Sequence, residues 1–306
     1  MPSRRKVLIT GVSGFLGWNL AVFCRSHVQL WGNYRNHAIR IKGCQTFPLD
    51  LTNTPQVKKI LADLKPEAII HTAAISHPDT CEENPEKAYR MNVEGTENLL
   101  SRLNPSTRFI YISTDLVFDG RKGWYKEEDP ANPLNVYAHT KWEAEKRVQD
   151  WGGSYAIVRT SLMYGLSNGI NNSFLQWMSR NLEAQHPVSL FTDQYRTCLF
   201  VRDAAQILYL LCGRRETGIF HLGGPERTNR YDFGKKLASM FGYPLDLIKP
   251  VVMQDVPARA IRAADCSLDS GKIIQLTGFR PCGVESGLRK ITSGRNHSLD
   301  ETHDRP

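Results

Sequence analysis

Short apolar runs alternate with longer segments of helical periodicity along the first 160 residues of the chain. The runs are bounded by charged or turn-forming residues, which is typical of buried strands, and the segments between them have the length of helices. The expected strands are residues 7–9, 28–34, 45–50, 67–71, 108–113 and 155–159, and the expected helices are residues 14–26, 54–64, 85–103 and 136–151. This alternation predicts βαβ units and a parallel sheet with helices on both faces.

The pattern loosens after residue 160, where the periodic segments become shorter and more mixed. We therefore expect an α/β fold with two parts, a Rossmann-type doubly wound domain and a smaller C-terminal α/β substrate lobe. The first takes residues 1–160 and 188–217, and the second takes residues 161–187 and 218–291. Residues 292–306 are polar and lack an evident periodicity, so they are expected to form a flexible tail.

The composition is that of an ordinary globular protein. Hydrophobic residues make up 41% and charged residues 23% of the 306 residues, which excludes a disordered chain. The net charge of +8 is spread along the chain, so a small phosphorylated ligand explains it as well as nucleic acid does, and we expect no nucleic-acid partner. The seven cysteines are scattered and the apolar runs are short. We therefore expect no metal site, no membrane span and a cytoplasmic location.

A glycine-rich turn follows the first expected strand. In this turn Gly11 permits the tight bend, Gly14 lets a pyrophosphate approach the backbone, and Gly17 lets the following helix pack on the strand. Its position between a strand and a helix predicts a dinucleotide site. The residues of the turn expected to bind the cofactor are Gly11, Ser13, Gly14, Phe15, Leu16 and Gly17.

The end of the second expected strand bears on which dinucleotide is bound. An NAD site usually carries an acidic residue here for the ribose 2′-hydroxyl, whereas this chain has Arg35. A guanidinium suits a 2′-phosphate through its charge and paired hydrogen bonds, although a solvent-exposed arginine is the simpler alternative. We expect NADP(H) to be preferred, with NAD(H) possible.

Two further segments carry side chains suited to carbonyl chemistry. Tyr137 and Lys141 are one helical turn apart, so they share a face on which an ammonium can lower the pKa of a phenol. Ser113 and Thr114 end the fifth expected strand, at the edge where ligands of open α/β sheets bind. Taken alone, a Tyr and a Lys at this spacing usually indicate a solvated helix face. A hydroxyl residue at a strand end caps the strand as often as it binds a ligand.

Together these segments resemble the extended short-chain dehydrogenase/reductases, and among them the dTDP-4-dehydrorhamnose reductase branch. Residues 113–120, with the sequence STDLVFDG, resemble the S-T-D-x-V-F-x-G signature of that branch. Residues 71–74, 91–96 and 133–137 also resemble segments of the branch, and the likeness covers about residues 5–290.

The resemblance implies a role for each matching residue. Thr114 would bind the substrate carbonyl, Tyr137 would donate the proton, and Lys141 would hold the nicotinamide ribose and tune Tyr137. Further cofactor contacts would come from Asp50, Leu51, Ala73 and Ala74, and the expected substrate contacts are Ser113, Thr114, Asp115 and Leu162. A nucleotide diphosphate also needs cations, and Arg196, Arg202 and Arg259 are the candidates in the smaller lobe.

One departure from the branch concerns the substrate. Leu162 stands where the rhamnose enzymes commonly carry Trp, so the pocket wall differs. We expect an NADPH-dependent reductase of a nucleotide-linked 4-keto-deoxysugar, with a homodimer as a possible assembly. Two alternatives stay open. One is an epimerase or dehydratase of sugar nucleotides, and the other is a non-catalytic NADP-binding regulatory subunit resembling the methionine adenosyltransferase beta subunit.

Overall fold

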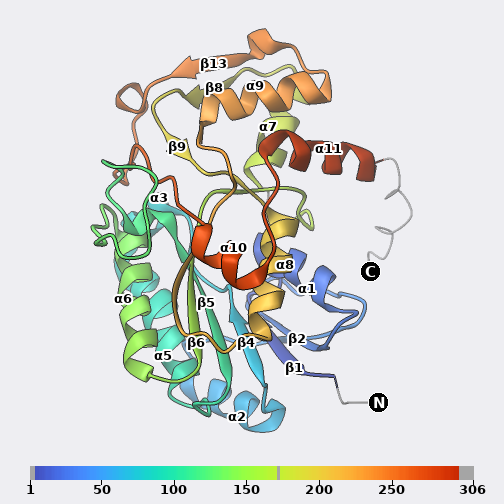
Figure 1. The fold of residues 1–306 in the computed structure, drawn as a ribbon, viewed down its shortest axis with the longest axis vertical. Coiled ribbons are helices and arrows are strands. Elements are labelled where there is room, and N and C mark those ends of the chain that lie inside the picture. The colour runs from blue at the N-terminus through green and yellow to red at the C-terminus, as the bar shows by residue number, and fades with distance from the viewer. Residues whose placement is uncertain (1–3, 171–172, 296–306) are drawn as a thin grey trace.

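The computed structural model describes residues 4–170 and 173–295, and a seven-stranded parallel sheet forms its centre (Figure 1). The strands lie in the order β11-β6-β5-β4-β1-β2-β3. From β1 the chain first adds β2 and β3 on one side and then adds β4, β5, β6 and β11 on the other, as in a doubly wound sheet. The expected Rossmann-type fold is therefore confirmed. The strands are β1 Lys6–Thr10, β2 Gln29–Tyr34, β3 Cys44–Pro48, β4 Ala68–His71, β5 Arg108–Thr114, β6 Tyr155–Thr160 and β11 Gly218–Leu222.

Helices cover both faces of this sheet because alternate strand residues point to opposite sides. In β1, Val7 and Ile9 enter one apolar core, and Leu8 enters the other. The first core is covered by α1 Phe15–Cys24, α8 Val201–Cys212 and α10 Gly271–Thr277. The second is covered by α2 Thr54–Leu64, by the consecutive α4 Pro85–Tyr89, η1 Arg90–Glu94 and α5 Gly95–Leu100, and by α6 Val136–Trp151.

The smaller lobe lies beyond the carboxyl ends of the central strands (Figure 1). Its apolar core contains the buried aromatic rings of Tyr164 and Phe233. Its larger elements are α7 Phe174–Glu183, β8 Val188–Phe191, α9 Arg230–Phe241, β13 Ile248–Val251 and α11 Val284–Arg295. The short elements of the chain are α3 Pro78–Glu83, η2 Asp115–Val117, β7 Met163–Tyr164, β9 Tyr195–Arg196, β10 Leu199–Phe200, β12 Thr228–Asn229, η3 Leu245–Leu247 and η4 Met253–Asp255.

Three boundaries differ from the expected division. Strand β8 was expected in the larger domain, but it pairs in parallel with β13 in the lobe. Strand β11 was expected in the lobe, but it pairs with β6 and forms the edge of the central sheet. Residues 292–295 are not part of a tail but complete α11, whose Leu288 and Ile291 are buried in the lobe core. The rest of the expected tail lies outside the described residues.

Within residues 4–170 and 173–295, the structure has no helix that is both long enough and apolar enough to cross a membrane.

Candidate functional site

The glycine turn has the geometry that a dinucleotide phosphate needs. Gly11 has a φ of +71°, and a Cβ built on it would lie 2.8 Å from the Cα of Ala73. A Cβ on Gly17 would overlap the carbonyl of Gly11, so these two positions are restricted to glycine. Helix α1 follows Gly14 without a side-chain cap and without an acidic residue in its first turn. Its N-terminal N–H groups therefore suit an anion, and the turn fits a pyrophosphate.

The other residues of the turn divide by burial. The side chain of Leu16 packs into the core, so only its backbone borders the turn. Ser13 and Phe15 are half-buried at the surface of the turn. The Ser13 carbonyl accepts a hydrogen bond of 3.0 Å from Nδ2 of Asn168. A loop of the smaller lobe thus reaches the glycine turn.

Two of the residues expected to bind the cofactor, Arg35 and Asp50, form an exposed ion pair. Nε of Arg35 lies 3.3 Å from Oδ2 of Asp50, and the two side chains are 40% and 35% exposed. Burial raises the pKa of Asp50, but hydrogen bonds from Thr52 and the charge of Arg35 outweigh it and lower the pKa on balance. Because exposed ion pairs are weak, an incoming phosphate can take the place of Asp50 beside Arg35. Leu51 is buried next to this pair and packs into the second core.

The segment after β4 borders the glycine turn directly. Ala73 and Ala74 are half-buried there, and the N–H of Ala73 donates to the hydroxyl of Thr10 at 3.3 Å. Thr10 in turn lies 2.6 Å from Nδ1 of His71, whose Nε2 lies 3.0 Å from the hydroxyl of Thr96. Burial is the main reason that the pKa of His71 is lowered to about 3. The side chains next to the glycine turn are therefore neutral and hydrogen-bonded to one another.

The three expected catalytic residues come together at the carboxyl edge of β5. Thr114 ends β5, while Tyr137 lies in the first turn of α6, where the side chain of Asn135 caps the helix. The hydroxyl of Thr114 donates to Oδ1 of Asp115 at 3.2 Å and lies near enough to the phenol of Tyr137 to lower its pKa. Lys141 follows one turn later and is 3% exposed. Strand and helix thus bring a hydroxyl, a phenol and an ammonium to one side of the sheet edge.

The pKa of Tyr137 moves in the opposite direction from the one expected. Burial raises it, the hydroxyl of Thr114 lowers it to a smaller extent, and the nearby carboxylate of Asp115 raises it again. The ammonium of Lys141 lies instead over the ring of Tyr111, with Nζ 4.1 Å from the ring centre. The prediction that Lys141 lowers the Tyr137 pKa is therefore wrong, and the phenol keeps its proton at neutral pH.

Lys141 is affected by its burial more than by any neighbouring charge. Burial lowers its pKa to about 7, and the carboxylate of Glu145, one turn further along α6, acts against that shift. The first turn of α6 is also fixed from outside, because Asn92 in the π-helical turn η1 donates to the hydroxyl of Thr140 at 2.9 Å. The catalytic face of α6 is thus held by side chains from neighbouring elements.

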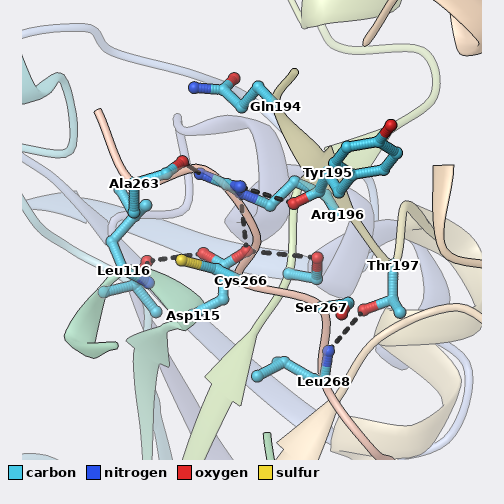
Figure 2. A network of polar contacts seen from close by, with 12 residues as sticks. Asp115, Leu116, Gln194, Tyr195, Arg196, Thr197, Ala263, Cys266, Ser267 and Leu268 are labelled. Atoms are coloured by element: carbon cyan, nitrogen blue, oxygen red, sulfur yellow. Dashed lines mark hydrogen bonds and ion pairs between the residues drawn. The ribbon is translucent and has the colours of Figure 1, made fainter. Parts of the chain in front are cut away.

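A second buried network connects the site to the smaller lobe (Figure 2). Nε of Arg196 lies 3.3 Å from Oδ2 of Asp115, and its other nitrogen atoms donate to the carbonyl groups of Tyr195, Ala263 and Ala264. Arg196 is 3% exposed. The expectation that Arg196 contacts a substrate diphosphate does not fit this geometry, because its donors are used in ties within the protein.

The remaining expected substrate residues lie close to this edge but differ in exposure. Ser113 is buried and donates to the carboxylate of Glu145, so its side chain points into the protein. Leu162 is half-buried, packs against the lobe core and accepts a backbone hydrogen bond of 2.8 Å from Leu199. Of these two residues, Leu162 is the one placed to meet a ligand.

Sequence reasoning overlooked two residues next to the site, Glu145 and Arg159, which form a buried ion pair. A signal for Glu145 was present. Tyr137, Lys141 and Glu145 follow one another at intervals of four residues, so they share one helix face, and a carboxylate on a buried face needs a partner. Among the described residues, no three or more His, Cys, Asp or Glu side chains form a cluster that could hold a metal ion.

Comparison with known proteins relates this geometry to one family. The model of the RmlD substrate binding domain matches residues 5–295. Over 303 residues, the chain is 32% identical to methionine adenosyltransferase 2 subunit beta of Bos taurus, which covers 94% of this chain and 88% of the relative. It is 30% identical over 299 residues to dTDP-4-dehydrorhamnose reductase of Aggregatibacter actinomycetemcomitans, which covers 94% of this chain and 98% of the relative.

A solved structure agrees with the fold over the same length. The crystal structure of dTDP-4-dehydrorhamnose reductase from Bacillus anthracis in complex with NADP has a TM-score of 0.81 and is 27% identical in sequence. The match covers 95% of this chain and 99% of that chain. Both the central sheet and the smaller lobe are therefore included in the likeness.

Proposed function

This chain belongs to the RmlD substrate-binding family, and we propose that it is an NADPH-dependent reductase that acts on the 4-keto group of a nucleotide-linked deoxysugar. One observation carries the proposal. Thr114, Tyr137 and Lys141 converge at the carboxyl edge of the sheet, on the same edge as a glycine turn shaped for a pyrophosphate.

Tyr137 is suited to donate a proton in the direction of reduction. A carbonyl that accepts a hydride becomes an alkoxide, and the alkoxide needs a proton donor within hydrogen-bond distance. Burial and the charge of Asp115 raise the pKa of Tyr137, so the phenol is protonated at neutral pH before the reaction starts. The hydroxyl of Thr114 beside it supplies a second hydrogen bond to the same substrate oxygen.

Lys141 has two roles in this proposal. Its buried ammonium would bind the ribose hydroxyls next to the nicotinamide, and it would stabilise the Tyr137 phenolate that remains after proton transfer. The second role requires the ammonium to move away from the ring of Tyr111, over which it lies. When bound, NADPH supplies the hydride.

The cofactor preference rests on the opposite end of the groove. The uncapped N-terminus of α1 would hold the pyrophosphate, and Arg35 would exchange Asp50 for the 2′-phosphate of NADPH. Asp50 is then available to accept a hydrogen bond from the adenine amino group. NADP in the similar Bacillus anthracis structure supports this preference. NAD(H) stays possible, because its pyrophosphate would use the same glycine turn.

The proposed substrate site lies between the carboxyl edge of the sheet and the smaller lobe. Leu162 would form part of its wall, and Thr114 would hold the reacting oxygen. A nucleotide sugar is the substrate class that the family relationship supports. The homodimer and the cytoplasmic location stay predictions from the sequence.

A regulatory role is the second candidate, because the chain is 32% identical to a subunit named as a part of methionine adenosyltransferase. A regulatory subunit needs a partner surface but no intact proton donor. The proximity of Thr114 to Tyr137 and the burial of Lys141 favour catalysis, since a site without chemistry has no need to bury an ammonium beside a phenol.

The proposed function is tested by following NADPH absorbance with a panel of nucleotide-linked 4-keto-sugars. We expect stoichiometric oxidation of NADPH with at least one of them, at a rate about 10² to 10⁴ lower for the Tyr137→Phe variant, which should still bind NADPH. An epimerase would convert a sugar without net consumption of cofactor. Tight NADPH binding without turnover of any sugar would contradict the proposal and favour the regulatory candidate.

A further inference from the structure

A cluster of buried polar side chains lies next to the proposed catalytic residues without being used in the chemistry above. It consists of Glu145 on α6, Arg159 on β6 and Ser113 on β5. Glu145 is 1% exposed, Arg159 is 3% exposed and Ser113 is 2% exposed. Burial of two full charges costs free energy that their mutual attraction often fails to recover, so stability alone is a weak reason for their presence.

The contacts of the cluster join the two elements that carry the proposed chemistry. Nη2 of Arg159 lies 2.7 Å from Oε2 of Glu145, and its Nε lies 3.0 Å from Oε1. The hydroxyl of Ser113 donates to the same carboxylate. Because Ser113 immediately precedes Thr114 and Glu145 follows Lys141 by one turn, this carboxylate ties the end of β5 to the catalytic face of α6.

Few groups around Lys141 carry a charge at neutral pH. His71 of β4 has a pKa lowered to about 3 by burial, and it is therefore neutral. Tyr111 of β5 is buried and Tyr137 of α6 is half-buried, and the pKa of each phenol is raised, so they are neutral as well. Glu145 is the carboxylate that acts on Lys141, and it is paired with Arg159.

We propose that Glu145, clamped by Arg159 and Ser113, is a positioning residue that fixes the register of β5 against α6 and supplies the negative charge that keeps the Lys141 ammonium protonated. Glu145 acts at a distance from Lys141, whose Nζ lies over the ring of Tyr111. Arg159 and Ser113 hold the Glu145 carboxylate in place, so Lys141 is free to turn toward ligands.

The physical reason is that a buried ammonium loses its proton unless an anion is near. Burial lowers the pKa of Lys141 to about 7, while Glu145 opposes the shift. Without that anion a larger share of the protein would hold a neutral amine at pH 7. A neutral amine neither stabilises a phenolate by charge nor donates charge-assisted hydrogen bonds to a ribose.

The test measures the titration of Lys141 in the free protein, by NMR of lysine labelled with ¹³C at Cε and assigned with the Lys141→Arg variant. In Glu145→Gln the amide still accepts from Ser113 but the charge is gone. We expect the Lys141 titration to move to lower pH by about one to two units. Glu143→Gln is the matched control, because it removes the same charge from an ion-paired, half-buried position on α6. The control should leave the Lys141 titration in place.

Two further variants separate the charge of Glu145 from packing and protect the test against loss of folding. Glu145→Gln leaves Arg159 without a partner, so its melting temperature should fall, whereas Glu145→Gln/Arg159→Gln leaves no lone charge and should recover stability. The double variant should keep most of the Lys141 shift. Arg159→Gln alone leaves the anion unmatched and should move the titration to higher pH.

The proposal is overturned if any folded variant that lacks the Glu145 charge titrates Lys141 as the wild type does, or if Glu143→Gln gives the same shift. A merely structural role predicts that the titration returns together with the melting temperature in the double variant. The inference rests on the proposed function only for the use that Lys141 serves. If no keto-sugar is reduced but the titration moves as expected, the proposed function fails and the role of Glu145 stands.

Discussion

The two ends of the proposed cofactor groove are built in different ways. At the nicotinamide end, Lys141 and Asp115 are 3% and 4% exposed. Hydrogen bonds or ion pairs join the residues around them to neighbouring elements. At the adenosine end, Arg35 is 40% exposed and its ion pair is with Asp50, which is 35% exposed.

Because of this difference, substitutions at the two ends should change different sets of properties. A substitution at the buried end disturbs packing, charge and chemistry together, because hydrogen bonds and ion pairs tie its residues to neighbouring elements. A substitution at the exposed end should alter affinity for one cofactor while stability stays nearly constant, since water replaces the lost partner.

Tyr137→Phe should give the largest effect, because it removes the proton donor and leaves the ring in place. Loss of a general acid costs about 10² to 10⁴ in rate. Steady-state kinetics with the true substrate measures the loss, and calorimetry with NADPH should show binding close to that of the wild type. Turnover equal to that of the wild type would remove Tyr137 from the mechanism.

Acid should destabilise the buried end through His71. Its pKa is lowered from 6.5 to about 3 in the folded protein, so the stability it contributes is complete above pH 6.5 and is lost as the pH falls toward 3. The loss is about 1.4 kcal/mol per pH unit for each such histidine. His221, with a similarly lowered pKa, adds to the slope.

The measurement is chemical denaturation between pH 7.5 and about pH 4.5, with His71→Gln as the variant that hydrogen-bonds without titrating. The variant should lose roughly half of the acid-dependent slope that the two histidines produce. An unchanged slope would mean that His71 is protonated in the folded protein, and the buried end would then be less tightly closed than the structure implies.

Arg35→Ala tests the exposed end. A charge-assisted hydrogen bond contributes roughly 1.5–3 kcal/mol, which corresponds to about 10- to 150-fold in affinity. NADPH binding should weaken by this factor, while NADH binding and the melting temperature stay nearly constant. Arg102→Ala is the control, since Arg102 is an exposed arginine after α5. Equal losses for both cofactors would show that Arg35 supports the fold instead of reading the 2′-phosphate.

Leu162→Trp probes the wall between the buried end and the smaller lobe, and its effect should be the smallest. Added bulk in a fitted wall costs about 1–3 kcal/mol, so kcat/KM for the native sugar should fall while NADPH affinity does not change. Leu245→Trp, at a 52% exposed position, serves as the control. If every keto-sugar tested is unaffected, Leu162 does not contact the substrate.

The larger domain was predictable because its signals are local. Apolar runs such as residues 7–9 and the turn after them specify a strand, a bend and a helix without reference to the rest of the chain. The lobe was harder, because the partners of its strands are set by distant contacts. Strand β8 could not be assigned to β13 from its own four residues. Helix α11 did carry a signal, since Val284, Leu288 and Ile291 have helical spacing, but polar neighbours obscured it.

In the site, too, local features were predictable from the sequence and tertiary ones were not. Sequence reasoning identified Thr114, Tyr137 and Lys141, and the structure brings them to one edge. It gave the wrong direction for the Tyr137 pKa because burial and the carboxylate of Asp115, both set by tertiary structure, raise it. Arg196 was mistaken for a ligand cation for a related reason. An arginine in the sequence gives no sign of whether its guanidinium faces solvent or three backbone carbonyl groups.

Whether the buried end performs a reduction is tested most directly by measuring the transfer of the hydride from NADPH to the sugar. NADPH deuterated at the transferable C4 position of nicotinamide is incubated with the enzyme and a nucleotide-linked 4-keto-sugar, and the product is analysed by mass spectrometry. We expect one deuterium at C4 of the sugar for each NADPH oxidised. With Tyr137→Phe, the rate of transfer should not exceed about one hundredth of the wild-type rate. Binding of NADPH with no deuterium in any sugar would contradict the proposed reduction.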